Sequence, residues 1–214
     1  MNLDQVKYEL QNILSGKSSQ SYDSTIQAVT SYLRESKSSS TLVKNELENK
    51  AEETKKLLIY AEKNQLTFNK INKANYVSEG AEQQVFIKNK DYVLKLNDAI
   101  YYTSWLDYFH NLLLHNYFFA DTAYQFLGFY KADEVLYAVV KQPFVEVDEF
   151  TDLENVKEFL INNGFKNTRN HDYYHTGLGI ILEDLHDENV LTKEKWLYFI
   201  DTVFYIKPDI FWNN

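Results

Sequence analysis

The stretch LEDLHDENVLTKEKWLYFID, residues 182–201, organises the C-terminal part of the chain. Polar segments separate three short apolar runs here, at 179–182, 190–191 and 196–200. Short apolar runs bounded by polar, turn-forming residues are typical of short strands. The pattern predicts strand, loop, short strand, turn and strand, which would bring Asp184, Asn189 and Asp201 to one end of a small sheet.

These three residues carry the groups that phosphoryl transfer from a magnesium nucleotide requires. Such a site needs an acid that receives or orients the proton of the attacking hydroxyl, and oxygen ligands that hold the metal against the phosphates. Asp184 suits the first role, and Asn189 with Asp201 the second. Taken alone, the segment has a simpler interpretation as a solvated turn between strands.

Three further strands are predicted upstream, in NYVS (75–78), QQVFIK (83–88) and YVLKLN (92–97). Lys95 lies inside the apolar alternation of the third strand, where a lysine needs either the surface or a partner. It is therefore either an edge-strand lysine facing water or a phosphate-binding lysine below the loop 78–82. Gly80 in that loop would allow close approach of the backbone to a ligand.

The order of these features resembles the protein-kinase-like fold over roughly residues 70 to 206. DLHDEN, 184–189, resembles the D-L-H-x-x-N loop of the atypical branch that includes aminoglycoside and choline kinases. The chain is identified as a compact kinase-like domain of the type found in bacterial and phage polyvalent proteins. This resemblance implies an α+β fold with a small antiparallel β N-terminal lobe and a reduced, mostly helical C-terminal lobe.

The resemblance also implies ATP and Mg²⁺ as cofactors, and a protein or small molecule as the unknown acceptor. The strand at 135–141 would lead into a hinge near 142–145, where backbone groups could meet an adenine. His186 would lie near the transferred phosphate. The implied site residues are Asp184, Lys95 and His186 for catalysis; Gly80, Glu82, Lys95, Gln142, Phe144 and Val145 for the nucleotide; and Asn189 and Asp201 for the metal.

One expected group is missing from the sequence. The family pairs its strand lysine with a carboxylate from the next helix, but 99–118 contains no glutamate and only Asp107 as an acid. Glu79 or Glu82 is an alternative partner, and the sequence does not choose between them. A kinase-fold binding module without catalysis is therefore the second functional hypothesis.

Composition narrows the class of protein. The chain has 214 residues, a net charge of -9 and no cysteine. An acidic chain without a basic cluster is not expected to bind nucleic acid or an anionic membrane. No window approaches the roughly 20 apolar residues of a membrane span, and we expect a cytoplasmic protein. The aromatic stretch 101–119 has helical spacing and predicts a buried helix.

Residues 1–68 differ in composition from the kinase-like part, 69–214, because they are rich in charged residues and serines and poor in aromatic residues. Apolar residues at helical spacing predict three helices, separated by serine-rich breaks at 15–24 and 36–41. We expect these helices to form an extension that could contact a protein partner. A helical interaction protein in which 69–214 is only a scaffold is the third hypothesis.

Histidine spacing suggests one alternative metal site. His171 and His175 are four residues apart in HDYYH and would share a face if the segment were helical. His186 or Asp172 could complete such a zinc site.

Overall fold

The computed structural model describes residues 2–17, 24–37, 46–69, 71–80 and 83–213. Three helices begin the chain, α1 (Leu3–Leu14), α2 (Ser24–Lys37) and α3 (Glu46–Lys63), which confirms the three predicted helices. In α1, Asn2 caps the first turn, and the buried side chains recur at three- and four-residue intervals: Val6, Leu10, Ile13 and Leu14. The apolar face of α1 is thus already covered within this chain.

A six-stranded sheet follows, in the order β1-β5-β6-β4-β3-β2. Its strands are β1 (Thr67–Phe68), β2 (Tyr76–Glu79), β3 (Gln83–Ile87), β4 (Tyr92–Asn97), β5 (Gln125–Ala132) and β6 (Val135–Pro143). The three upstream strands predicted from the sequence are β2, β3 and β4. Register pairs Lys95 of β4 with Val85 on one side and Val140 on the other, so the lysine lies on an inner strand and not at an edge.

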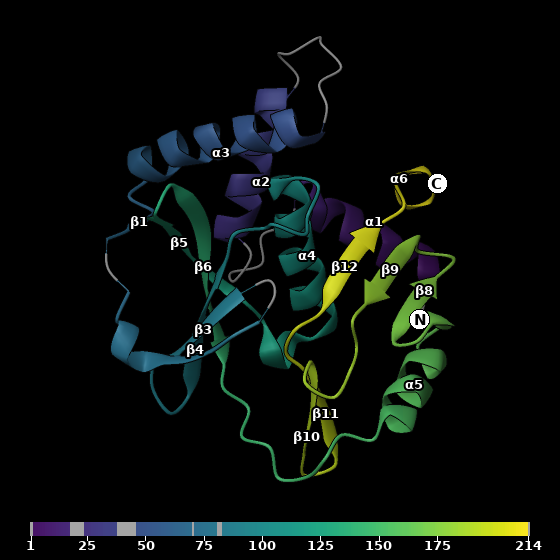
Figure 1. The fold of residues 1–214 in the computed structure, drawn as a ribbon. Coiled ribbons are helices and arrows are strands. Elements are labelled where there is room, and N and C mark those ends of the chain that lie inside the picture. Colours follow the sequence, from purple (N-terminus) through teal and green to yellow (C-terminus); the bar gives the residue numbers. More distant parts are fainter. Residues whose placement is uncertain (1, 18–23, 38–45, 70, 81–82, 214) are drawn as a thin grey trace.

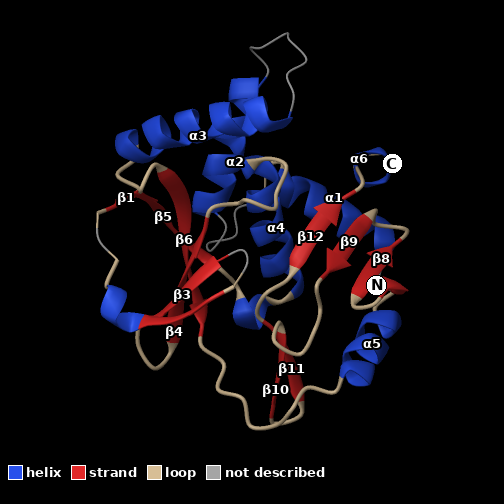
Figure 2. Ribbon diagram, in the orientation of Figure 1, coloured by secondary structure: helices blue, strands red, loops and turns tan. Residues whose placement is uncertain are grey.

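Helix α4 (Trp105–Phe118) lies between this sheet and the C-terminal strands (Figures 1 and 2). Ser104 caps it, and ten of its residues are buried. Edge-to-face contacts join Trp105 and Phe109 to Phe129 of β5 at centroid distances of 6.1 Å each. The predicted aromatic core helix is confirmed.

The chain after β6 differs from the expectation of a mostly helical lobe. Among the described residues it forms two short helices, α5 (Leu153–Asn162) and α6 (Pro208–Phe211), and six strands. These are β7 (Lys166–Arg169), β8 (Asp172–His175), β9 (Ile180–Glu183), β10 (Val190–Lys193), β11 (Trp196–Phe199) and β12 (Val203–Ile206). The prediction was wrong here because these segments are short, turns separate them, and all but β7 are rich in aromatic or β-branched residues.

These strands form a four-stranded sheet, β12-β9-β8-β7, and a hairpin of β10 and β11. The hairpin confirms the predicted short strand, turn and strand. Residues 184–189 connect β9 to β10, and Asp201 follows β11. The two polar segments singled out in the sequence therefore lie at adjacent strand ends.

One hydrophobic cluster joins the N-terminal helices to the rest of the chain. It includes Leu10 of α1, Leu33 of α2, Leu57 of α3 and Phe109 of α4, all fully buried. β1 also adds to the large sheet, as a parallel partner of β5. The division at residue 68 stays a prediction. No helix in the described part of the chain is long and apolar enough to cross a membrane.

Candidate active site

A cleft of about 290 Å³ lies between the six-stranded sheet and the β10–β11 hairpin. Val85, Val93, Leu191 and Ile200 contribute apolar walls. The structure brings together in this cleft seven of the predicted nucleotide and metal residues: Gly80, Lys95, Gln142, Phe144, Val145, Asn189 and Asp201. Glu82 lies outside the described residues. The volume is near the lower end of the range for small-molecule sites.

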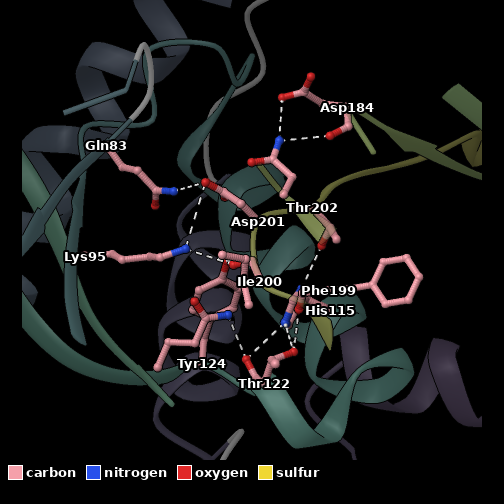
Figure 3. A network of polar contacts seen from close by, with 12 residues as sticks. Gln83, Lys95, His115, Thr122, Tyr124, Asp184, Phe199, Ile200, Asp201 and Thr202 are labelled. Atoms are coloured by element: carbon pink, nitrogen blue, oxygen red, sulfur yellow. Dashed lines mark hydrogen bonds and ion pairs between the residues drawn. The ribbon is translucent and has the colours of Figure 1, made fainter. Parts of the chain in front are cut away.

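Lys95 and Asp201 meet in the cleft (Figure 3). Lys95 is 4% exposed. Its Nζ donates to the Ile200 carbonyl at 2.8 Å and lies 3.9 Å from Asp201 Oδ2. Burial lowers the pKa of Lys95, and the Asp201 charge partly offsets that effect. Burial likewise raises the pKa of Asp201, and Lys95 opposes the rise. The pair thus places a cation and an anion side by side in one pocket.

Gln83 is a site residue that the sequence analysis missed. Its amide nitrogen, at the start of β3, donates to Asp201 Oδ2. The sequence carries no signal for this contact, since 118 residues separate the two side chains. Asp201 is therefore held by two residues of the large sheet although its own backbone belongs to the C-terminal part.

Asp184, His186 and Asn189 form a second cluster, in the loop after β9. Asn189 Nδ2 donates to the Asp184 carbonyl at 2.9 Å and to Asp184 Oδ2 at 3.0 Å. His186 Nε2 lies 3.4 Å from Asp184 Oδ1 and 3.1 Å from Asn189 Nδ2. The Asp184 side chain is 57% exposed, so its carboxylate can meet an external acceptor.

The backbone of this loop is constrained. Asp184 has φ of 65°, a left-handed conformation that few residues other than glycine, asparagine and aspartate adopt. Its N–H donates to Asp172 Oδ1 at 3.2 Å, and the N–H of Leu185 donates to the His171 carbonyl at 3.2 Å. The end of the β7–β8 hairpin thus supports the loop in this conformation.

The two predicted metal residues are linked directly. The Asn189 carbonyl accepts from the N–H of Ile200 at 2.9 Å and of Asp201 at 3.4 Å. Because Asn189 uses its amide nitrogen for Asp184, its amide oxygen is the atom that it can offer to a cation. A carboxylate and an amide oxygen on one cleft wall are the donor types that magnesium takes. The residues present therefore fit that ion.

A comparison with protein families matches residues 50–208 to the serine/threonine/tyrosine kinase found in polyvalent proteins. The chain belongs to this family. The match begins within α3 and extends through β12. A search of curated proteins and one of solved structures found no match.

In the described part of the chain, the carboxylate paired with Lys95 does not come from helix α4. Asp107 accepts from Ser104 Oγ at 2.7 Å, at the first turn of α4. Glu79 accepts from Gln84 at 3.0 Å. The carboxylate beside Lys95 is Asp201, which the sequence analysis did not consider as its partner.

The alternative zinc site does not form. His171 lies in a turn, and His175 ends strand β8, so the helical spacing that would bring their rings together is not present. His175 Nδ1 accepts from the Leu178 N–H at 3.1 Å. Among the described residues, no group of three or more His, Cys, Asp or Glu side chains could hold a metal.

Proposed function

We propose that this kinase is an ATP- and Mg²⁺-dependent phosphotransferase that transfers the γ-phosphate to a hydroxyl acceptor. The observation that carries the proposal is the shared cleft. Lys95, Asn189 and Asp201 lie in it together with Phe144 and Val145, which follow strand β6. A bound magnesium nucleotide would supply the phosphoryl group and the charge neutralisation for its transfer. Asn189 and Asp201 would hold the metal, and Lys95 the phosphates.

The hinge offers one backbone donor to an adenine. The Gln142 side chain is buried and donates to the Thr122 carbonyl at 2.8 Å, away from a role as a base contact. Pro143 has no N–H, and the N–H of Phe144 donates to the Asp91 carbonyl at 2.8 Å. We therefore assign the adenine contact to the N–H of Val145, which lines the cleft.

Gly80 would serve the phosphates. A Cβ at this position would meet no atom of the described residues within 4 Å. Its N–H closes the β2–β3 turn by donating to the Gln83 carbonyl at 2.9 Å. The backbone at Gly80 would therefore have room to approach a ligand in the cleft.

Asp184 would orient the acceptor hydroxyl and take its proton. Its exposure suits an acceptor that arrives from solvent, and Asn189 and His186 hold the carboxylate from one side. His186 would then lie beside the transferred phosphate. Positioning and charge supply most of the acceleration in this chemistry, so few protein groups are needed.

A nucleotide-binding module without turnover is the second candidate. It is favoured by the pairing of Lys95 with Asp201, because the family's pairing of the lysine with a helix carboxylate is absent from the described residues. In that case the cleft binds the nucleotide but the lysine is not positioned for transfer.

The first test is calorimetric titration of ATP into the purified chain with and without Mg²⁺, alongside Asp201→Ala. We expect binding that requires both the metal and Asp201. Release of phosphate from bound ATP then separates the two candidates, since the binding module shows none. Absence of binding at millimolar ATP would contradict both and leave the helical scaffold hypothesis.

A further inference from the structure

Helix α4 contacts the Asp201 segment through a histidine. His115 Nδ1 lies 2.7 Å from the hydroxyl of Thr202, the residue after Asp201 (Figure 3). On the other side of the ring, Nε2 lies 3.1 Å from the Thr122 carbonyl and 3.2 Å from its hydroxyl. Thr122 in turn donates to the Phe199 carbonyl. The ring thus contacts two separate segments, the one after Asp201 through Thr202 and the one before β5 through Thr122.

His115 cannot shift without breaking these bonds. It is fully buried, and its ring packs 4.5 Å from that of Tyr124. The Tyr124 hydroxyl donates to the Ile200 carbonyl at 2.8 Å, the same oxygen that accepts from Lys95. Buried polar groups of this kind are strongly held, because an unpaired one is costly. His115 therefore ties the location of α4 to that of residues 199–202.

The N-terminal helices hold α4 at its two ends. At the start, Glu53 of α3 accepts from the Trp105 N–H at 2.7 Å, and Thr54 accepts from the Trp105 indole at 2.9 Å. A carboxylate at a helix N-terminus also interacts favourably with the helix dipole. Near the other end, the Tyr117 hydroxyl donates to Glu9 of α1 at 3.1 Å. Movement of α1 or α3 would therefore move α4.

We propose that His115 is a positioning residue that transmits the placement of α4, and through it that of the N-terminal helices, to the carboxylate of Asp201. The inference rests on the proposed function, in which Asp201 holds magnesium. It assigns to His115 and Thr202 the task of joining α4 to the site. It also gives the N-terminal helices a regulatory role, because a partner that displaced them would misplace a metal ligand.

The test compares the Mg²⁺ dependence of ATP binding among matched variants. Thr202→Val removes the hydroxyl, and His115→Gln moves the amide to the Thr122 side of the pocket. His115→Asn places an amide where Nδ1 lies and so retains the contact with Thr202. Residues that orient metal ligands typically contribute 10- to 100-fold to metal affinity. We expect Thr202→Val and His115→Gln to raise the half-maximal Mg²⁺ concentration by about that factor. His115→Asn should keep the half-maximal Mg²⁺ concentration of the native chain.

Asn111→Ala is the control for general destabilisation. Asn111 is a buried residue of α4 that accepts from the Phe204 N–H at 2.8 Å, beyond the Asp201 turn. This variant should lose stability but keep the Mg²⁺ dependence of the native chain. Equal Mg²⁺ dependence in Thr202→Val and the native chain, or an equal loss in Asn111→Ala, would overturn the proposal.

A double-mutant cycle tests the route from α3. Glu53→Gln should raise the Mg²⁺ requirement in the native chain and add nothing in the Thr202→Val background, since both act on one path. No effect of Glu53→Gln in the native chain, or the same effect in both backgrounds, would exclude transmission through His115.

Amide hydrogen exchange tests the linkage without nucleotide. The N–H groups of Ile200 and Asp201 donate to the Asn189 carbonyl and report the order of the segment. We expect faster exchange at both in Thr202→Val and His115→Gln, and native exchange in His115→Asn. Unchanged exchange in Thr202→Val overturns the linkage. If the native chain binds no ATP with Mg²⁺, the proposed function fails, and exchange alone decides the linkage.

Discussion

Lys95 and Asp201 form an ion pair across the candidate active site, with Lys95 Nζ 3.9 Å from Asp201 Oδ2. The same Nζ donates to the carbonyl of Ile200, one residue earlier, at 2.8 Å. The lysine of β4 thus holds the turn after β11 through both a side chain and the backbone. Its expected partner on the following helix has been replaced by the residue that would bind the metal.

Lys95→Met should weaken ATP binding without unfolding the chain. Loss of one charge-assisted hydrogen bond costs about 1.5 to 3 kcal/mol, which is roughly 10- to 100-fold in affinity. Asp201 loses its cation in this variant, but its side chain is 33% exposed and keeps the contact with Gln83. The free energy of unfolding should therefore fall by less than about 3 to 5 kcal/mol, which is the cost of removing one partner from a fully buried ion pair. Calorimetric titration and urea denaturation measure the two effects. Lys141→Met, on β6, is the control, since Lys141 lies over the Tyr92 ring and not in the cleft.

Asp184→Asn should abolish phosphate release while sparing ATP affinity. Loss of a positioned acid or base typically slows the reaction by about 10² to 10⁴. Asparagine tolerates the left-handed backbone of this position, so the loop should keep its conformation. Phosphate release from ATP is the assay. Asp187→Asn, an exposed acid in the same loop, should behave as the native chain. Full activity in Asp184→Asn would exclude it as the catalytic acid.

The free energy of unfolding should fall as the pH is lowered, because His115 is buried without a charge. Burial lowers the pKa of His115 from 6.5 to about 3. The unfolded chain therefore takes up a proton below pH 6.5 that the native chain refuses until near pH 3. Between these values the free energy of unfolding should fall by about 1.4 kcal/mol for each pH unit lost. His115→Asn carries no titrating ring, so urea denaturation across this range should show a shallower decline than in the native chain.

Gly128→Ala should disrupt the attachment of β1 to the large sheet. Gly128 has φ of 141°, and a Cβ there would lie 2.3 Å from the Leu66 carbonyl oxygen. That oxygen accepts from the Phe129 N–H at 2.7 Å, so it cannot move away freely. We expect a loss of more than about 3 kcal/mol, measured by denaturation. Gly80→Ala is the control, because its Cβ meets nothing within 4 Å. Similar losses of stability in both variants would contradict the prediction, because only the Cβ at position 128 would clash with the Leu66 carbonyl oxygen.

Local patterns were sufficient for the elements that carry the site. Alternation around Lys95 predicted β4, the aromatic spacing after Tyr101 predicted α4, and the apolar runs near Asp201 predicted the β10–β11 hairpin. Each pattern lies within a few residues of the side chain that it places. The prediction failed after β6, where the chain makes several short strands in place of helices. There the resemblance to larger kinases outweighed the local strand signals.

The partners of the site residues were beyond reach of such patterns. The Lys95 contact with Ile200 spans 105 residues, and the His115 contact with Thr202 spans 87. Neither histidine nor threonine at these positions carries a signal of its role, since both also occur in ordinary cores. Which carboxylate meets Lys95 was left open between Glu79 and Glu82, and the structure places Asp201 beside it.

The sequence by itself determined the order of the strands around Lys95, the buried helix α4 and the loop that carries Asp184 and Asn189, because hydrophobic periodicity and short turns act over neighbouring residues. It also contained the spacing by which the kinase family is identified. Only the tertiary structure decided which side chains face one another in the cleft and how the N-terminal helices hold α4. Those contacts depend on how distant segments pack around a common core, and the hydrophobic effect that drives this packing is not directional.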